Sequence, residues 1–216
     1  MLEYFSFESA QTTQTRITRK PLIMVTARFF LWIVFVSITI PVFSYADETI
    51  SCTPKPPYEA PQYVEPIKKP EVSKLHLIDN NDGTITDPDS GLLWAKKDSY
   101  ADLGKCLTWQ ESIDYVEKLG TANHSDWRMP TIKELSTLYD PTKENNMAWD
   151  HNPEYPLALD EKFADGSAYW FWSSDCGVVE GKRCCAKTLY FVKGLIHYRN
   201  LEQCNNGGVR PVRSLK

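Results

Sequence analysis

The 216-residue sequence predicts an α+β domain in which two helices pack on short antiparallel sheets, with a long irregular loop and disulfide staples. Three observations support this fold class. Two segments begin with the hydrogen-bonding pattern of a helix N-terminus, and strand-like segments lie before and after them. In addition, six cysteines follow a leader of the secretory type. The part after the leader has the length of one domain.

Residues 1–46 have the layout of a secretory signal peptide. Residues 29–40 are apolar apart from two hydroxyl side chains, basic residues precede them, and Ser44 and Ala46 are small residues before a cleavage point. Met24 would begin a signal peptide of ordinary length, so it is a second candidate start. The alternative is an uncleaved anchor, since the apolar segment is close to the shortest length that spans a bilayer.

Residues 47–74 are expected to form a proline-rich spacer before a domain at 75–216. Six prolines occur between positions 54 and 70, and proline fixes φ and removes backbone donors. The spacer could also lie along the domain as a strap. A periplasmic or secreted protein is expected, with a membrane partner only if the leader is retained or Cys52 is lipidated.

Two helices are predicted from capping boxes. Thr108 with Glu111, and Thr131 with Glu134, each place a hydroxyl and a glutamate where they can bond reciprocally to the helix N-terminus. The helices would end near the glycine at 120 and before the proline at 141. Their apolar faces would consist of Trp109, Ile113 and Val116 in the first helix and of Ile132, Leu135 and Leu138 in the second.

Strands account for most of the remaining sequence. The loop is predicted at 141–166, and residues 79–87 resemble a calcium loop at first sight. However, Gly83 stands at position five of the EF-hand template and Ser90 replaces the glutamate at twelve, so a hairpin turn is expected instead. Strands are predicted at residues 76–78, 84–86, 92–95, 168–173, 188–192, 195–199 and 208–213.

The cysteines are expected to form disulfides, because they follow a secretory leader. Sequence alone leaves fifteen pairings open, although the adjacent Cys184 and Cys185 are expected to reach different partners, with Cys176 and Cys204 nearest. No Cys-x-x-Cys pair occurs and the histidines are scattered, so neither a metal nor another cofactor is expected. The six positions are Cys52, Cys106, Cys176, Cys184, Cys185 and Cys204.

Charge is unevenly distributed along the chain. After residue 46 there are 20 basic and 26 acidic residues, a net charge of −6, but from residue 181 onward eight cations face one acid. A basic C-terminal part could attract a polyanion. The alternative, which we favour, is that the cations form ordinary ion pairs with the acidic body. No nucleic-acid partner is expected.

The motifs of the domain resemble those of the Lcl C-terminal domain family, the module that ends a bacterial collagen-like surface adhesin. The resemblance rests on residues 121–135, 79–87, 91–94, 172–174 and 209–213. It implies a C-type-lectin-like fold. Cysteines that family members often carry are replaced here by Val116 and Pro211, so the resemblance implies no pairing for this chain. The collagen-like repeat is also missing from the spacer.

The resemblance implies fold and compartment more firmly than activity. The calcium and sugar motifs of animal C-type lectins are absent, and so is the spaced cysteine pair of the related formylglycine-generating enzymes. No Ser-His-Asp context or phosphate-binding glycine loop is recognisable, so no catalytic residue is expected. The expected function is non-catalytic binding of a glycan or polyanion at the cell envelope. The alternatives are a structural or protein-interaction module, and a redox or copper enzyme at Cys184 and Cys185.

Candidate ligand-binding side chains combine aromatic faces with cations. Indoles stack on sugar rings, and guanidinium groups bind anions. The competing interpretation places Trp127 in the core and Arg128 against nearby carbonyls. It also buries both faces of the aromatic strand at 169–174. The ligand-binding candidates are Trp127, Arg128, Trp170, Trp172, Lys182, Arg183 and Arg199.

Overall fold

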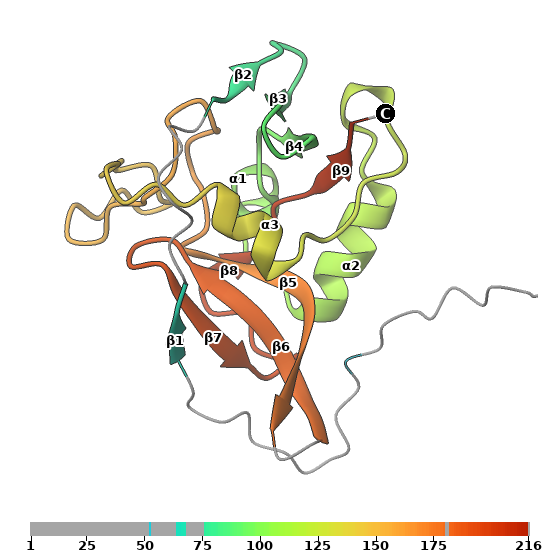
Figure 1. Cartoon of the computed structure of the whole chain (residues 1–216), viewed down its shortest axis with the longest axis vertical. Helices are drawn as coiled ribbons and strands as arrows, with labels where there is room; N and C mark the ends of the chain where they lie inside the picture. Colours follow the sequence, from blue (N-terminus) through green and yellow to red (C-terminus); the bar gives the residue numbers. More distant parts are fainter. Residues whose placement is uncertain (1–51, 53–63, 68–75, 180–181, 216) are drawn as a thin grey trace, which may run out of the picture. The chain divides into compact units, whose positions relative to one another are not determined.

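We analysed a computed structural model, which describes residue 52 and residues 64–67, 76–179 and 182–215. At residues 179 and 182–184 only the backbone is described. All described residues belong to one compact unit (Figure 1). The predicted signal peptide at 1–46, Met24 and most of the spacer lie outside them. Within the described residues, no helix is long and apolar enough to span a membrane.

The smaller of two sheets joins the beginning and the end of the domain. Its order is β2-β3-β4-β9, and all three pairings are antiparallel. Between β2 and β3, Asp79 accepts from the Asn81 amide, Asp82 accepts from the Thr84 amide, and Lys96 pairs with Asp79. The predicted hairpin turn is therefore confirmed. The strands are β2 (Ile78–Asp79), β3 (Thr84–Asp87), β4 (Leu92–Ala95) and β9 (Val212–Ser214).

The larger sheet has the order β1-β7-β6-β5-β8 and carries the long strands of the C-terminal half. β5 and β6 form a hairpin. Its far end, where Gly177, Val178 and Val179 pair with β6, extends beyond Ala186, the residue at which the pairing of β6 with β7 stops (Figure 1). The strands are β1 (Val64–Pro66), β5 (Trp170–Val179), β6 (Lys182–Tyr190), β7 (Leu195–Arg199) and β8 (Gly207–Gly208).

Both predicted helices begin at their capping boxes. In α2 (Trp109–Lys118) the Thr108 hydroxyl accepts from the Glu111 amide, and in α3 (Ile132–Thr137) the same relation joins Thr131 and Glu134. A 3₁₀ turn, Thr121–Asn123, follows α2. α3 packs against β5 and β6. It ends four residues before Pro141, so the proline is not what stops it.

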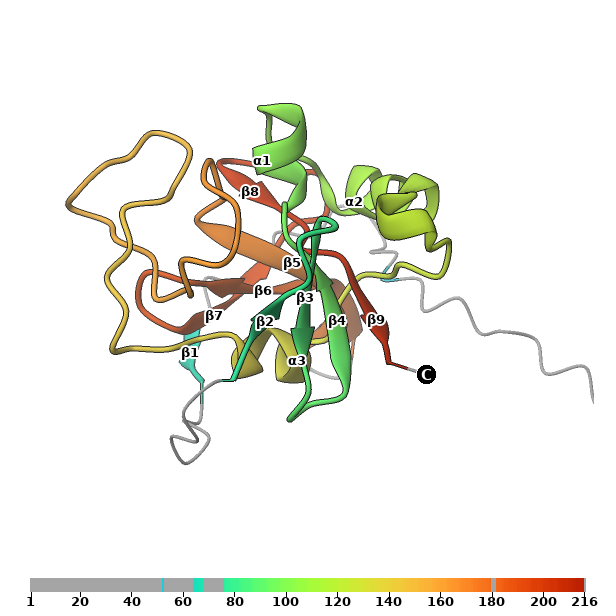
Figure 2. The ribbon, with the colours of Figure 1, turned by 90° about the horizontal axis from the view of Figure 1, so that it is seen from above.

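A third helix, α1 (Ser99–Leu103), was not predicted. Asp98 caps it by accepting from the amides of Tyr100 and Ala101, and Gly104 ends it in the left-handed conformation with φ 67°. Position 101 is an alanine, so the capping-box pattern is missing. α1 lies beside β8, to which it is joined through Ser99 and Val209 (Figures 1 and 2).

The strand predicted at 208–213 is divided between the two sheets. Gly207 and Gly208 run parallel to the start of β5, whereas Val212 to Ser214 pair with β4. Between them, Arg210 turns inward and is fully buried. A buried guanidinium is stable only when polar groups bond to it. Arg210 therefore lies in the segment between β8 and β9, which belongs to neither sheet.

Two disulfides are described. Cys52 is bonded to Cys176 at β5, and Cys106 to Cys204, which links the segment before α2 to the turn before β8. Cys176 and Cys204 are therefore not the partners of Cys184 and Cys185, contrary to the prediction. Their nearness in sequence was misleading because the fold brings more distant cysteines to them. Cys185 is buried and also disulfide-bonded, whereas the Cys184 side chain lies outside the described part.

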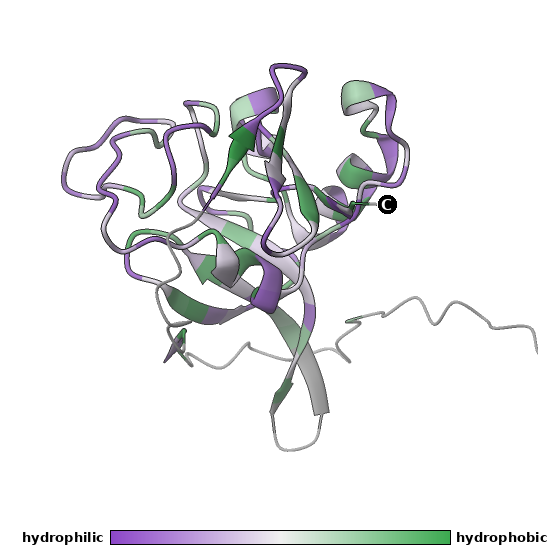
Figure 3. Ribbon diagram, turned by 45° about the horizontal axis from the view of Figure 1, so that its top comes forward, coloured by the Kyte–Doolittle hydropathy of each residue, from purple (hydrophilic) through white to green (hydrophobic). Residues whose placement is uncertain are grey.

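The loop at 141–166 is held to the domain by its own apolar residues. Figure 3 shows hydrophilic and hydrophobic stretches alternating along it, and Leu157, Leu159 and Phe163 are buried. Trp149 stacks on Tyr100 of α1, with 5.6 Å between ring centroids. The loop lies at the end of the domain away from β9 (Figures 1 and 2). It is irregular, as predicted, but it has a fixed path that brings three of its side chains to a pocket.

Candidate functional site

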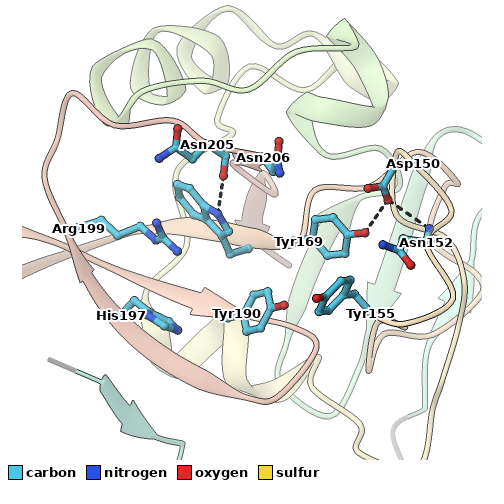
Figure 4. A pocket seen from close by; sticks show the side chains of 10 residues that line it. Asp150, Asn152, Tyr155, Tyr169, Tyr190, His197, Arg199, Asn205 and Asn206 are labelled. Atoms are coloured by element: carbon cyan, nitrogen blue, oxygen red, sulfur yellow. Dashed lines mark hydrogen bonds between the residues drawn. The ribbon is translucent and has the colours of Figure 1, made fainter. Parts of the chain in front are cut away.

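A pocket of about 370 Å³ lies between the long loop, the larger sheet and the turn before β8 (Figure 4). Aromatic side chains form much of its lining, and charged or amide groups stand among them. Its volume falls in the lower part of the range for small-molecule sites. The lining residues are Asp150, Asn152, Tyr155, Tyr169, Trp170, Tyr190, His197, Arg199, Asn205 and Asn206.

Strand register explains why four of these side chains share one face. Trp170 of β5 is paired with Tyr190 of β6. Thr188 and Ala186, two and four residues before Tyr190, are paired with His197 and Arg199 of β7. Because side chains two apart along a strand point to the same face, these pairings align all four pocket residues. The pocket is thus built on a rigid three-stranded surface.

The turn before β8 closes one side of the pocket. Asn205 and Asn206 have positive φ, of 26° and 58°, which asparagine tolerates better than most residues. The Asn205 carbonyl accepts from the Trp170 indole at 2.8 Å. A Cβ on Gly207 would lie 2.2 Å from the same indole, so glycine is needed for the backbone to approach the ring.

Arg199 presents a guanidinium group that no described residue binds through a hydrogen bond or an ion pair. Its central carbon lies 4.2 Å from the centre of the Trp170 ring, so the group is stacked on the indole. Its Nε is buried and has no hydrogen-bond partner in the part of the chain that the structure describes. Burial lowers the pKa of Arg199, but an arginine remains protonated in proteins. The pocket therefore contains a cation with unused donors.

Acceptors and phenols lie on the opposite side of the pocket (Figure 4). Asp150 accepts from the Tyr169 hydroxyl at 2.5 Å and from the Asn152 amide at 3.3 Å. Burial, together with this hydrogen bond, raises the pKa of Tyr169, so its phenol stays neutral at physiological pH. Tyr155, which is 42% exposed, packs edge-on against Tyr169 and offers an open aromatic face.

Of the predicted aromatic candidates, only Trp170 lines the pocket, and it does so as a core residue that is 3% exposed. Trp127 is 4% exposed, packs with Leu93 and Ala95, and donates to the Thr121 carbonyl at 3.3 Å. Trp172 is fully buried and donates to the Leu107 carbonyl at 2.9 Å. Neither indole has a face for a ligand, so both are corrected to core residues, in line with the competing interpretation stated above.

Arg128 belongs to the capping arrangement of α3 instead of a ligand site. Its guanidinium makes two bonds to the Glu134 carboxylate, at 2.6 and 2.9 Å, while its backbone pairs with Val212. Burial raises the pKa of Glu134, but the bonds from Arg128 and Thr131 outweigh this and bring it below its ordinary value. Glu134 thus fastens Arg128, in the segment before α3, to the first turn of that helix.

Glu134→Gln should lower the free energy of unfolding at neutral pH by about 1–2 kcal/mol, because it removes charged hydrogen bonds. Since the folded pKa is depressed, this stability is complete above the ordinary value of 4.5 and is lost as the pH falls through the folded pKa. Urea titrations from pH 7 to pH 3 should therefore show the difference between wild type and variant shrinking. Glu144→Gln, at an exposed carboxylate, is the control, and a pH-independent difference would contradict the assignment.

Two cations of the C-terminal part are paired with carboxylates of the preceding part of the domain. Arg210 pairs with Asp98 at 2.7 Å inside the core, and Arg213 pairs with Asp126 at 2.7 Å. These are the ordinary ion pairs that the sequence analysis favoured. The candidate side chains of Lys182 and Arg183 lie outside the described part. Of the predicted cations whose side chains are described, Arg199 is the one that lines the pocket.

Most of the pocket could not be found from sequence. Asp150, Asn152 and Tyr155 come from the loop, where no periodic pattern predicts which way a side chain points. His197 stands two residues before Arg199 on one predicted strand, a spacing that indicates a common face but not an open one, and Tyr190 belongs to the strand before it. No cluster of three or more His, Cys, Asp or Glu side chains suited to a metal occurs among the described residues.

Comparison with known proteins identifies the family of this chain. The model of the Lcl C-terminal domain matches residues 83–213. No curated protein and no solved structure matches the chain significantly. The matched region runs from the β2–β3 turn to β9 and contains every residue that lines the pocket. The chain therefore belongs to the Lcl C-terminal domain family.

Proposed function

We propose that this domain is a non-catalytic binding module whose pocket holds a glycan. The observation that supports it is the combination of open aromatic faces with hydrogen-bonding groups in a cavity of about 370 Å³. Sugars present apolar C–H faces and polar hydroxyl edges, so a site needs aromatic rings and both donors and acceptors. Tyr155 and Tyr190 supply the rings, while Asn152, Asp150 and Asn205 supply polar groups.

We propose further that the module works in the periplasm or outside the cell. Disulfides persist in oxidising compartments, and the described part contains two, with Cys185 in another. We also infer a C-type-lectin-like architecture. Its support is the sheet in which β2, at the start of the domain, and β9, at its end, are brought together. Solution of an experimental structure and a comparison of its topology would test this relation.

A glycan array that includes sulfated polysaccharides, screened at low and physiological salt, tests the binding function. We expect wild type to bind a defined group of glycans with little salt dependence, because contacts in a pocket are screened less than surface charges. Tyr155→Ala should reduce affinity about five- to tenfold through loss of one aromatic wall. Ile78→Ala removes an exposed apolar side chain on β2, outside the pocket lining, and should leave affinity unchanged.

Two outcomes would contradict this proposal. A blank array with folded protein would remove the glycan function and direct attention to protein partners. Binding that falls steeply with salt, and that Tyr155→Ala does not affect, would instead indicate a polyanion held on surface cations.

A further inference from the structure

We propose that the pocket selects sugars that carry one carboxylate and that Arg199 binds this carboxylate. The proposal rests on the glycan-binding function and specifies its ligand class. It begins from the guanidinium described above, which has neither a hydrogen bond nor an ion pair to any described residue. The Nη groups, unlike Nε, are not among the buried unpartnered atoms and make no hydrogen bond to a described residue, so their N–H donors are open to a ligand.

The stacking on Trp170 prepares the guanidinium for a planar anion. The central carbon lies 4.2 Å over the indole centre, a cation–π contact that holds the guanidinium beside the pocket, where its Nη groups can bind a ligand. A carboxylate matches these groups with two parallel hydrogen bonds. The indole is itself fixed by its bond to the Asn205 carbonyl at 2.8 Å. Little side-chain freedom is left to lose when a ligand binds.

The other charges of the pocket favour a ligand with a single negative charge. Figure 4 places Asp150 on the side of the pocket opposite Arg199, with Tyr190 and Tyr155 between them. One guanidinium and one carboxylate leave the pocket with little net charge. A chain with several sulfates would bring anions close to Asp150, whereas sugar hydroxyls can donate to it.

His197 does not add a second cation at neutral pH. Burial, and to a smaller extent the charge of Arg199, lowers its pKa, so the imidazole is neutral there. Burial likewise raises the pKa of Tyr190, which remains a neutral phenol. Arg199 is therefore the group in the pocket that discriminates an acidic from a neutral sugar.

Calorimetric titration of the oxidised protein with matched sugars tests the proposal. Three pairs differ in the presence of a carboxylate: glucuronic acid and glucose, galacturonic acid and galactose, and N-acetylmuramic acid and N-acetylglucosamine. Glucose 6-sulfate supplies a single anion of a different shape. We expect at least one carboxylated sugar to bind about 10- to 100-fold more tightly than its neutral partner, and more tightly than the sulfate ester.

Variants assign the preference to one side chain. Arg199→Gln should abolish the preference while the neutral sugar still binds within about twofold of wild type, which also shows that the pocket is intact. Arg199→Lys should retain part of the preference for the carboxylated sugar, because an ammonium keeps the charge but cannot donate two parallel hydrogen bonds. Lys133→Gln removes the same charge from an exposed position on α3 and should change nothing.

The possible results distinguish a failure of the carboxylate assignment from a failure of the glycan-binding function. Equal affinities within every pair, with both members weakened by Tyr155→Ala, would overturn the carboxylate assignment and keep the glycan pocket. Tighter binding of the sulfate ester, or equal losses in Arg199→Gln and Lys133→Gln, would also overturn the assignment. No binding of any sugar, together with a blank array, would overturn both.

Discussion

Arg210→Met should lower the free energy of unfolding by about 3–5 kcal/mol, because it leaves the buried carboxylate of Asp98 without its counter-ion. Both side chains are fully buried, and the guanidinium bonds to Asp98 at 2.7 Å and to Ser167 at 2.9 Å. Two aromatic rings cover it, with Phe163 at 4.4 Å and Phe171 at 4.7 Å from its central carbon. Urea denaturation followed by tryptophan fluorescence measures the loss.

A double-mutant cycle isolates the ion pair. Asp98→Asn retains an acceptor for the α1 amides but removes the charge, and we expect a loss of similar size. The double variant should be less destabilised than the sum of the single variants, by more than about 1 kcal/mol, since no unpaired charge remains. Lys97→Met breaks an exposed pair with Asp102 and should change stability by less than about 0.5 kcal/mol. Additive losses would contradict the assigned pair.

Replacing both Cys106 and Cys204 by serine should lower the free energy of unfolding by about 2–5 kcal/mol. The disulfide closes a long loop, with a sequence separation of 98 residues, and thereby restricts the unfolded chain. It also precedes Asn205 and Asn206 directly, at the edge of the pocket. We therefore expect weaker sugar binding as well, measured by calorimetry well below the unfolding transition.

The other described disulfide supplies the control for this effect. Removal of Cys52 and Cys176 opens a loop with a separation of 124 residues and should destabilise the domain to a similar extent. Neither cysteine lines the pocket, so affinity should be preserved. Equal losses of affinity in the two double variants would show that the effect on binding comes from reduced stability, and not from the pocket edge.

Local signals in the sequence predicted the helices that have complete caps. Thr108 with Glu111 and Thr131 with Glu134 identify α2 and α3 because each box is contained within four residues. The short helix α1 depends on Asp98, whose partners Arg210 and Ser167 lie 112 and 69 residues away. No window of sequence contains that relation, and the local N-cap Asp98 has no glutamate three residues on to complete a capping box, so α1 was not predicted.

The sequence also predicted only some residues of the candidate site. Trp170 and Arg199 combine an indole with a cation, and the structure stacks one on the other. Trp127, Trp170 and Trp172 look equivalent in the sequence and all three are buried, but of the three only Trp170 also lines the pocket. Which tryptophan of a strand remains beside an open pocket depends on the segments that cover the strand, and these come from distant parts of the chain.

The central claim, that the pocket holds the ligand, is tested most directly by ¹H–¹⁵N NMR. The Nε–H resonance of Arg199 and the indole N–H of Trp170 report on the pocket itself, and backbone amides report on the rest of the domain. During titration with the carboxylated sugar that binds most tightly, the account predicts that shifts concentrate at Arg199, Trp170, Asn205 and Tyr155. Shifts confined to surfaces away from these residues, with the Arg199 Nε–H unchanged, would contradict it.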